Sequence, residues 1–463
     1  MIEAASVVRR GCGHAGTLMA VKYVIIIPDG AADLPMEQLG DRTPLEAARM
    51  PNLARLAAAG RVGCAWTTPD GFEAGSDVCS MSLLGYDQAK YHTGRAPLEA
   101  AALGLNPGPS DWIFRLNLVT TGGADGEEGG TARVDAPGGV DTIEQGLMLD
   151  HSAGAISNAE ARVLVKDLVA AWAAREPELV RGIVVTPGVS YRNIFVDTSG
   201  RSYADVMCTP PHAIPREPWG PHLPRGGEGS EVLRRLMLLS REVLAGHEVN
   251  RARVEQGLRP ATMAWLWGQG TRPRVPSFRE RFGMRGAMIT SVDLLAGIAA
   301  YIGWERVDVA GLTSYHDTDY AAQGRATIEA IHQFDLVCSH VESPDELSHQ
   351  GDWKTKVAAM EAIDREIVGP VARELEEKFG DPQKDPGAKG WRLLVMPDHY
   401  TLCSTRKHDA TPVPFLMAGA WVRSAVQRPF SERAALESDL RIEHGHDLME
   451  YFLKGGLANV RGR

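Results

Sequence analysis

The chain has 463 residues and a formal net charge of −10, from 49 Lys and Arg against 59 Asp and Glu. Its length allows two or three domains, each with a sizeable core. The acidic balance argues against a nucleic acid or an anionic membrane surface as the main partner. A small anionic substrate stays compatible, because a few local arginines or bound cations can override the global charge.

Cysteine usage and hydropathy predict a cytoplasmic protein. The 6 cysteines show no CxxC pair or regular spacing, so we expect reduced, mostly buried thiols. No apolar run reaches the roughly 20 residues that span a bilayer, and the first residues lack the apolar segment of a signal peptide. Met19 directly precedes the first apolar run, so residues 1–18 are expected to be a loose extension or to reflect a mis-set start.

The N-terminal part begins with a predicted strand, Val24 to Ile27, and the acid Asp29 follows at its end. A turn and then one helix are expected over residues 40–60, where Pro44 suits a helix start. Ser76 precedes another run with helical spacing. A hydroxyl at a helix N-terminus meets unsatisfied N–H groups that favour a phosphate oxygen or an alkoxide, although an ordinary N-cap serine gives the same pattern.

The middle of the chain differs from the flanking parts in composition and in its pattern of apolar residues. This difference predicts an inserted α+β domain over residues 108–282. We expect strands at 112–120, 182–188 and 193–197, and amphipathic helices at 157–174 and 230–247. Residues 122–139 predict a low-complexity loop, and the proline-rich stretch 208–229 predicts a second irregular segment. We expect this domain to bind substrate and to act as a lid.

Strands and helices resume over residues 286–311, and a buried strand is predicted at 335–341. Pro344 then suits the first turn of a helix that carries Asp345 and His349 four positions apart. Such residues project from one helical face, as two ligands of one metal ion must, although a solvated helix face often shows the same spacing.

A third apolar run stops at Asp398 and His399, and His408 follows in a loop-like stretch. Parallel strands deliver such residues to one edge of a sheet, where α/β folds assemble their sites. Burying unpaired carboxylates costs on the order of several kcal/mol, which favours a metal site over buried core acids. For Asp29 to reach this site, residues 1–107 and 283–463 must form one discontinuous domain.

Nine motifs occur in a characteristic order between about residues 22 and 415. They are PDG (28–30), GSDVCSMSLLGYD (75–87), TGRAPLEAA (93–101), SAGAIS (152–157), GVSYR (188–192), CTPPH (208–212), WLWGQG (265–270), SPDELSHQGD (343–352) and PDH (397–399). Together they resemble the archaeal-type 2,3-bisphosphoglycerate-independent phosphoglycerate mutases of the alkaline phosphatase superfamily. The resemblance implies an α/β, alkaline phosphatase-like core, with a mostly parallel sheet flanked by helices and a smaller inserted α+β domain.

The resemblance also implies two divalent ions, Mn²⁺, Zn²⁺ or Mg²⁺, and no 2,3-bisphosphoglycerate. One ion would be held by Asp345, His349 and His408, and the other by Asp29, Ser76, Asp398 and His399, with Ser76 as the phosphorylated nucleophile. Four residues are candidate substrate contacts, because Arg suits carboxylate or phosphate binding and Asp and His can move protons. They are Arg115, Asp150, Arg192 and His212, and an ordinary structural role stays open for each.

We therefore predict an isomerase of glycolysis and gluconeogenesis that interconverts 2- and 3-phosphoglycerate, as a monomer or small homo-oligomer. Asn193 stands where the family more often has His, and Gln323 and Ala296 stand where Lys is common, which leaves the substrate open. The alternatives are a homoserine kinase-like phosphotransferase, a phosphatase on another phospho-metabolite, and a non-catalytic metal-stabilised scaffold.

Overall fold

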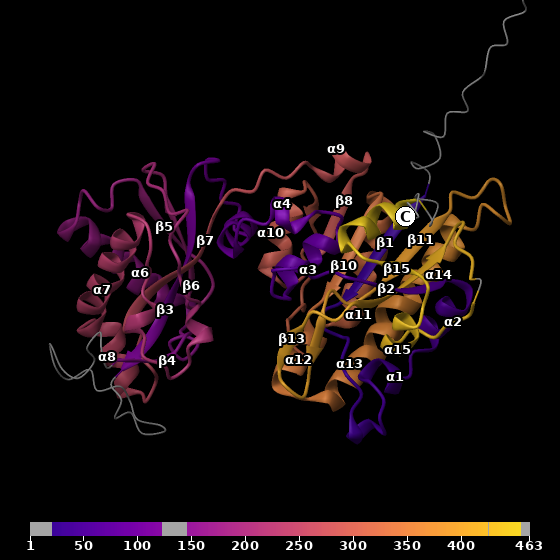
Figure 1. The fold of residues 1–463 in the computed structure, drawn as a ribbon, viewed down its shortest axis with the longest axis horizontal. Coiled ribbons are helices and arrows are strands. Elements are labelled where there is room, and N and C mark those ends of the chain that lie inside the picture. Colours follow the sequence, from indigo (N-terminus) through magenta and orange to yellow (C-terminus); the bar gives the residue numbers. More distant parts are fainter. Residues whose placement is uncertain (1–20, 123–145, 425, 455–463) are drawn as a thin grey trace, which may run out of the picture. The chain divides into compact units, whose positions relative to one another are not determined.

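The computed structural model describes residues 21–122, 146–424 and 426–454. It divides into two compact units (Figure 1): the larger comprises the chain up to Lys90, Pro276–Leu295 and Ile302 onward, and the smaller comprises Tyr91–Val275 and Ala296–Tyr301. Apart from Gly122, which ends a strand, the expected loop at 122–139 lies outside the described residues, as does the expected extension at 1–18.

The larger unit is built on an eight-stranded sheet in the order β15-β2-β14-β11-β1-β10-β8-β9. Neighbouring strands are parallel except that β14 is antiparallel to β11 and β2. The strands are β1 (Lys22–Pro28), β2 (Arg61–Ala65), β8 (Gly286–Ile289), β9 (Glu305–Arg306), β10 (Leu336–Val341), β11 (Trp391–Val395), β14 (Val413–Gly419) and β15 (Arg441–Ile442). A separate hairpin consists of β12 (Tyr400–Leu402) and β13 (Lys407–Asp409).

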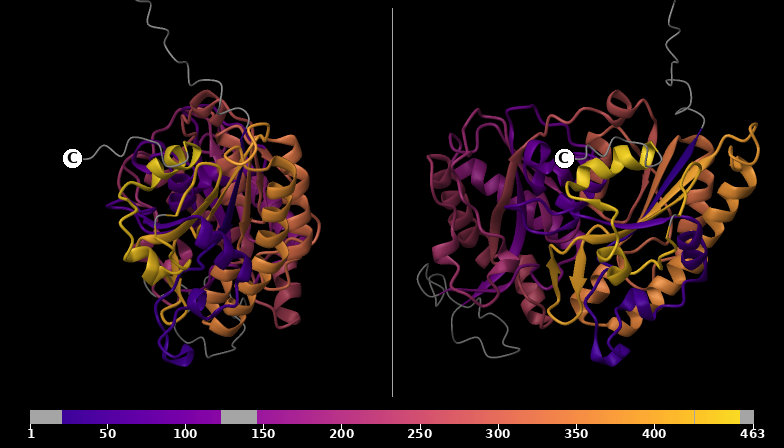
Figure 2. Two further views of the ribbon diagram at one scale, coloured as in Figure 1. Left: turned by 90° about the vertical axis from the view of Figure 1, so that its right-hand side faces the viewer. Right: turned by 45° about the vertical axis from the view of Figure 1, so that its right-hand side comes forward.

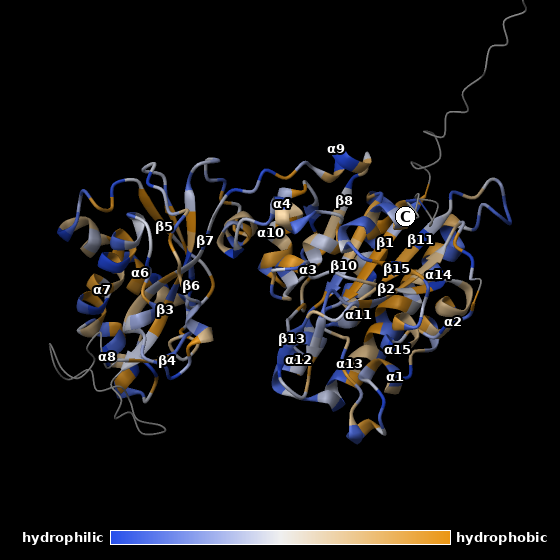
Figure 3. Ribbon diagram, viewed as in Figure 1, coloured by the Kyte–Doolittle hydropathy of each residue, from blue (hydrophilic) through white to orange (hydrophobic). Residues whose placement is uncertain are grey.

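This sheet is covered on both faces, which is why its central strands are continuous apolar runs. Successive side chains of β1 alternate between the faces. Val24 and Ile26 join a core with residues of α2, α11 and α14, whereas Tyr23 meets Phe452 of α16 edge-on, with ring centroids 5.6 Å apart. Figures 1 and 2 show α11, α13 and α14, in orange, along one side of the sheet, and Figure 3 shows the apolar colour of β1 and β11.

Helix starts in the larger unit follow local capping chemistry. Thr43 and Glu46 form a capping box. The expected single helix over 40–60 is wrong, because Pro51 lacks an N–H and disfavours a helical Met50, which has φ −119° and ψ 71°. The helices are α1 (Pro44–Ala47), α2 (Pro51–Ala59), α3 (Ser76–Leu83), α4 (Gln88–Tyr91), α9 (Phe278–Phe282), α11 (Tyr320–Gln333), α12 (Ser343–Gln350), α13 (Trp353–Ile363), α14 (Gly369–Phe379), α15 (Glu432–Leu436) and α16 (Leu448–Leu453), with a π-helical turn at Asp364–Val368. Helix α10 (Asp293–Tyr301) is divided between the two units after Leu295.

The smaller unit contains an antiparallel sheet in which β3 pairs with β4, β6 and β7, and β5 pairs with β6. Its core includes Phe114, Trp172 and Trp265, and helices α6 and α7 contribute to it. The elements are α5 (Arg95–Ala102), β3 (Trp112–Gly122), β4 (Leu147–Asp150), α6 (Asn158–Arg175), β5 (Ile183–Pro187), β6 (Arg192–Asp197), α7 (Gly229–Ala245), α8 (Glu248–Glu255) and β7 (Met263–Thr271).

Two further expectations are met. The stretch 208–228 holds only two three-residue 3-10 turns, Pro211–Ala213 and Gly220–His222, so it is irregular as predicted. The five described cysteines carry free thiols, and four of them are buried. Over the described part of the chain, no helix is both long and apolar enough to cross a membrane.

Candidate metal centre

The carboxyl ends of β1, β10 and β11 deliver the acidic and histidine side chains of the centre. These strands are parallel neighbours with β1 in the middle, so their ends meet at one edge of the sheet. Asp29 follows β1, and Asp398 and His399 follow β11. The Nε2 atom of His399 lies 3.3 Å from Asp29 Oδ1 and 3.5 Å from Asp398 Oδ2, and all three residues are fully buried.

Ser76 is the first residue of α3 and faces this group. Gly75 is the N-cap of α3 and no side chain caps the helix, so Ser76 is not an ordinary N-cap serine. Its hydroxyl donates a hydrogen bond to Asp29 Oδ2 (3.1 Å) and lies 3.4 Å from His399 Nε2. The hydroxyl therefore lies at the positive end of α3 and among potential metal ligands.

A second group forms around Asp345. As the i, i+4 spacing on α12 predicted, His349 Nε2 lies 3.1 Å from Asp345 Oδ2. His408, on β13, brings its Nε2 to 3.4 Å from Asp345 Oδ1 and 3.0 Å from His349 Nε2. The structure thus places Asp345, His349 and His408 within reach of one ion.

Hydrogen bonds assign the tautomers of the two histidines. Nδ1 of His349 donates to the Arg406 carbonyl (2.9 Å), and Nδ1 of His408 donates to the Ala74 carbonyl (3.0 Å). In the neutral rings both Nε2 lone pairs then face each other at 3.0 Å, which is unfavourable unless a proton or a cation binds them. A metal-ligating histidine usually donates the proton on one ring nitrogen to a carbonyl, as Nδ1 does here, and binds the metal through the other nitrogen.

The charges of the cluster also fit cations. Burial, together with Asp29, raises the pKa of Asp398 to about 7. Burial, then Asp29 and Asp345, raises the pKa of Glu342 well above its ordinary value. Among the described residues, Asp29 Oδ1 and Glu342 Oε2 are buried and find no hydrogen-bond partner. Buried anions of this kind call for a partner, and carboxylate and imidazole donors suit Mn²⁺, Zn²⁺ or Mg²⁺.

His340 and Glu342 belong to the same cluster and were not predicted from the sequence. His340 Nε2 lies 2.8 Å from Asp29 Oδ2 and 3.7 Å from Glu342 Oε2. His340 lies near the carboxyl end of β10, and Glu342 is the N-cap residue of α12 directly after that strand. Their position beside Asp29 depends on β10 lying next to β1.

Two of the four candidate substrate contacts meet in the smaller unit. The guanidinium of Arg115 lies 4.2 Å from the centroid of the Trp267 ring, and the His212 ring lies 5.1 Å from it. Arg115 also forms an ion pair with Glu99, with 3.0 Å between Nε and Oε2. His151 lies 6.1 Å from His212, ring to ring. Trp267 and His151 were not singled out from the sequence, although WLWGQG pointed to the former.

The other two candidates have local partners. The Asp150 carboxylate accepts hydrogen bonds from the Ser152 hydroxyl (2.6 Å) and the Gly154 amide (3.2 Å), and pairs with Arg259 at 3.1 Å. It therefore closes a turn. Arg192 extends its guanidinium to 5.6 Å from the centroid of the neighbouring Tyr191 ring.

The three departures from the family pattern are accommodated inside the fold. Gln323 is buried and donates to the His340 carbonyl (2.8 Å), and Asn193 is buried and donates to the Tyr191 carbonyl (3.1 Å). Ala296 is 4% exposed.

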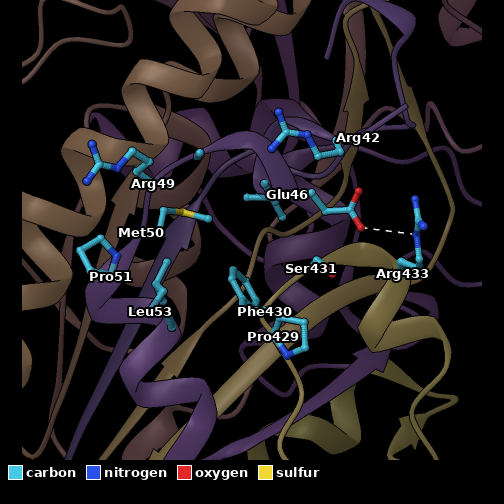
Figure 4. Close-up of a pocket in the computed structure, with 13 residues that line it drawn as sticks. Arg42, Glu46, Arg49, Met50, Pro51, Leu53, Pro429, Phe430, Ser431 and Arg433 are labelled. Atoms are coloured by element: carbon cyan, nitrogen blue, oxygen red, sulfur yellow. Dashed lines mark ion pairs between the residues drawn. The ribbon is translucent and has the colours of Figure 1, made fainter. Parts of the chain in front are cut away.

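A pocket elsewhere in the larger unit contains none of the candidate ligands. It has a volume of about 680 Å³, and Figure 4 shows Arg42, Arg49 and Arg433 around apolar side chains. Arg433 Nε lies 3.5 Å from Glu46 Oε1. The complete lining is Arg42, Leu45, Glu46, Ala48, Arg49, Met50, Pro51, Leu53, Ala54, Pro429, Phe430, Ser431 and Arg433.

Comparison with known proteins places the chain in a family. A family model described as 2,3-bisphosphoglycerate-independent phosphoglycerate mutase matches residues 57–250. The protein of that name from Methanothrix thermoacetophila is 41% identical over 435 residues, which cover 94% of this chain and 100% of the relative. This chain belongs to the 2,3-bisphosphoglycerate-independent phosphoglycerate mutases. A probable member from Geobacter sulfurreducens is 39% identical, with 94% and 100% coverage.

Solved structures share the fold of this chain. A protein from Pyrococcus horikoshii matches with a TM-score of 0.72 and 25% identity, covering 94% of this chain and 97% of that one. The cofactor-independent phosphoglycerate mutase from Thermoplasma acidophilum matches with a TM-score of 0.58 and 24% identity, covering 94% and 100%. The expected α/β fold, with its mostly parallel sheet and flanking helices, is confirmed, as is the enzyme class, an isomerase.

Proposed function

We propose that this chain interconverts 2-phosphoglycerate and 3-phosphoglycerate in the cytoplasm, through a phosphoserine at Ser76. The position of the Ser76 hydroxyl carries the proposal. It lies at the N-terminus of α3, donates to Asp29 and faces His399 Nε2. Backbone N–H groups at a helix N-terminus favour a phosphate on that oxygen.

Seven residues would hold two divalent ions, of which Mn²⁺, Zn²⁺ and Mg²⁺ are the candidates. We assign Asp345, His349 and His408 to one ion, and Asp29, Ser76, Asp398 and His399 to the other. The ligand atoms of Asp29, Asp345 and His399 also lie within 4.8 Å of one another, so the two sets are in contact. When bound, such ions lower the pKa of a coordinated hydroxyl and neutralise charge on the phosphoryl oxygens. His340 orients the Asp29 carboxylate through its 2.8 Å contact.

The reaction is a pair of reciprocal transfers. The Ser76 oxygen attacks the phosphorus of the substrate, the new O–P bond forms as the bond to the glycerate oxygen breaks, and that oxygen takes up the proton which the serine lost. The other hydroxyl of the glycerate then attacks phospho-Ser76 and returns its proton to the serine. Water must be excluded between the two steps, since hydrolysis would release phosphate.

The smaller unit would bind the glycerate part of the substrate and act as the lid expected for residues 108–282. Arg115 is suited to the carboxylate, because guanidinium groups bind carboxylates bidentately. His212 lies on the same tryptophan and would contact a hydroxyl, with Arg192 and Asp150 as further contacts. Ligand-dependent hydrogen exchange tests this role: unchanged protection throughout the smaller unit would contradict it.

A direct assay separates the candidate functions. Purified protein loaded with Mn²⁺ should convert 3-phosphoglycerate into 2-phosphoglycerate, detected through coupled enzymes, at a rate independent of added 2,3-bisphosphoglycerate. Release of inorganic phosphate without isomerisation would identify a phosphatase instead. Phosphorylation of homoserine from ATP, with no isomerisation, would identify the kinase-like alternative.

A further inference from the structure

One hydroxyl touches a ligand of each proposed cation site. Thr401, in β12, donates a hydrogen bond from Oγ1 to Asp345 Oδ1 at 2.5 Å. The same oxygen lies 3.1 Å from Nδ1 of His399. In the proposed assignment Asp345 belongs to one set of ligands and His399 to the other, and their ligand atoms lie within 4.8 Å of each other and of Asp29. Thr401 itself is fully buried.

The direction of these hydrogen bonds is determined by their chemistry. The Asp345 carboxylate can only accept, so the hydroxyl proton points to Oδ1 and the lone pairs of Oγ1 remain available. His399 Nδ1 therefore donates to Thr401, with the Tyr400 carbonyl as a second, longer acceptor at 3.3 Å, which leaves its Nε2 unprotonated in the neutral ring. That Nε2 faces Asp29 Oδ1 at 3.3 Å and Ser76 Oγ at 3.4 Å, as a ligand nitrogen should.

The surroundings hold the Thr401 backbone in place. Its N–H donates to the Ala32 carbonyl (3.1 Å), and its carbonyl accepts from the buried Lys356 ammonium (2.9 Å), which pairs with Asp33 at 3.0 Å. Gly30 leaves the necessary room: a Cβ there would lie 2.5 Å from both Thr401 Oγ1 and Asp345 Oδ1. The backbone hydrogen bonds of Thr401 and the space left by Gly30 therefore fix the position of the hydroxyl.

We propose that Thr401 is a positioning residue that couples the two cation sites, by orienting the His399 ring and the Asp345 carboxylate with one hydroxyl. The inference rests on the proposed two-cation function. It predicts that removing this single hydroxyl weakens both sites together, because each loses the partner that orients one ligand. Loss of such a partner typically lowers metal affinity by roughly 10- to 100-fold.

The test is Mn²⁺ titration of the metal-free protein by calorimetry, with three variants. Thr401→Val keeps the shape and removes the hydroxyl, and Thr401→Ser restores it. Thr327→Val is the matched control, because Thr327 is equally buried and its hydroxyl contacts only Gln323 and Ser339. We expect both affinities to fall at least tenfold in Thr401→Val and to stay near wild type in Thr401→Ser and Thr327→Val.

Other outcomes are distinguishable. Wild-type affinities in Thr401→Val, or weakening of one site alone, would overturn the coupling. A wild-type protein that binds no Mn²⁺ would overturn the proposed function instead. If Thr401→Val does not fold, NMR spectra of the metal-free wild type decide. A slowly exchanging Thr401 hydroxyl proton together with a proton on Nδ1 of His399 supports the bridge, and a proton on Nε2 of His399 alone, or a Thr401 hydroxyl proton in fast exchange with water, refutes it.

Discussion

Lys356 and Asp33 form a fully buried ion pair beneath the candidate metal centre, and breaking it should be costly. The Lys356 ammonium has no exposed side-chain surface and lies 3.0 Å from Asp33 Oδ2 and 2.9 Å from the Thr401 carbonyl. Lys356→Met would leave the Asp33 carboxylate, 1% exposed, without its counter-charge. Removing one partner of a buried pair destabilises by about 3–5 kcal/mol.

Hydrogen exchange measures this loss in the larger unit separately from the smaller one. At about 1.4 kcal/mol per factor of ten, amides of β1 and β11 that exchange through unfolding should exchange roughly two to four orders of magnitude faster in Lys356→Met. Asp33→Asn combined with Lys356→Met removes both charges and should recover much of the protection. Arg55→Met is the control, because the Arg55–Glu376 pair is exposed at 49% and 38% and contributes about 1 kcal/mol at most.

Two results would contradict the role of the buried pair. If β1 and β11 of Lys356→Met exchange within about fivefold of wild type, as expected for Arg55→Met, the carboxylate of Asp33 is not held by Lys356. If the double variant is no better protected than Lys356→Met, the loss comes from packing and not from the unpaired charge.

Two further predictions concern Glu432 and Gly30. Burial raises the pKa of Glu432 to about 7, above its ordinary value near 4.5, so its protonated form stabilises the fold at pH 4.5 and this contribution is lost as the pH rises through 7. We therefore compare the melting temperatures of metal-free wild type and metal-free Glu432→Gln. The wild-type value minus the variant value should decrease from pH 5 to pH 8; a constant difference would contradict a raised pKa of Glu432. Gly30→Ala places a Cβ 2.5 Å from Asp345 Oδ1 and should lower Mn²⁺ affinity at least roughly tenfold, whereas Gly40→Ala, with a similar positive φ and no atom within 4 Å, should bind Mn²⁺ normally. Equal Mn²⁺ affinities in the two alanine variants would contradict the clash.

Much of the metal centre could be predicted from local patterns. Asp29, Asp398 and His399 follow apolar runs long enough to be buried strands, and Asp345 and His349 share a helical face by their spacing alone. The break between α1 and α2 was also predictable, because Pro51 forbids the helix that the apolar spacing suggested.

The remaining features depend on contacts between distant segments. His340 and Glu342 join the cluster because β10 pairs with β1, more than 300 residues away in sequence. The proposed role of Thr401 depends on where its hydroxyl lies in the folded structure. Neither the composition nor the periodicity of the sequence predicts that position. The turn that uses the Asp150 carboxylate likewise follows from backbone conformation, since Ala153 and Gly154 both have positive φ.

The central claim is that Ser76 carries the phosphate during turnover. The most direct measurement is to mix Mn²⁺-loaded enzyme with ³²P-labelled 3-phosphoglycerate, quench within one turnover and locate the label by peptide mapping. Ser82→Ala is the control, since Ser82 lies further along α3, whereas Ser80 donates to Asp398. We predict label on Ser76 that passes into 2-phosphoglycerate, in wild type and Ser82→Ala, and neither label nor isomerisation in a folded, metal-binding Ser76→Ala. Near-normal isomerisation by Ser76→Ala, or label on another residue, would contradict it.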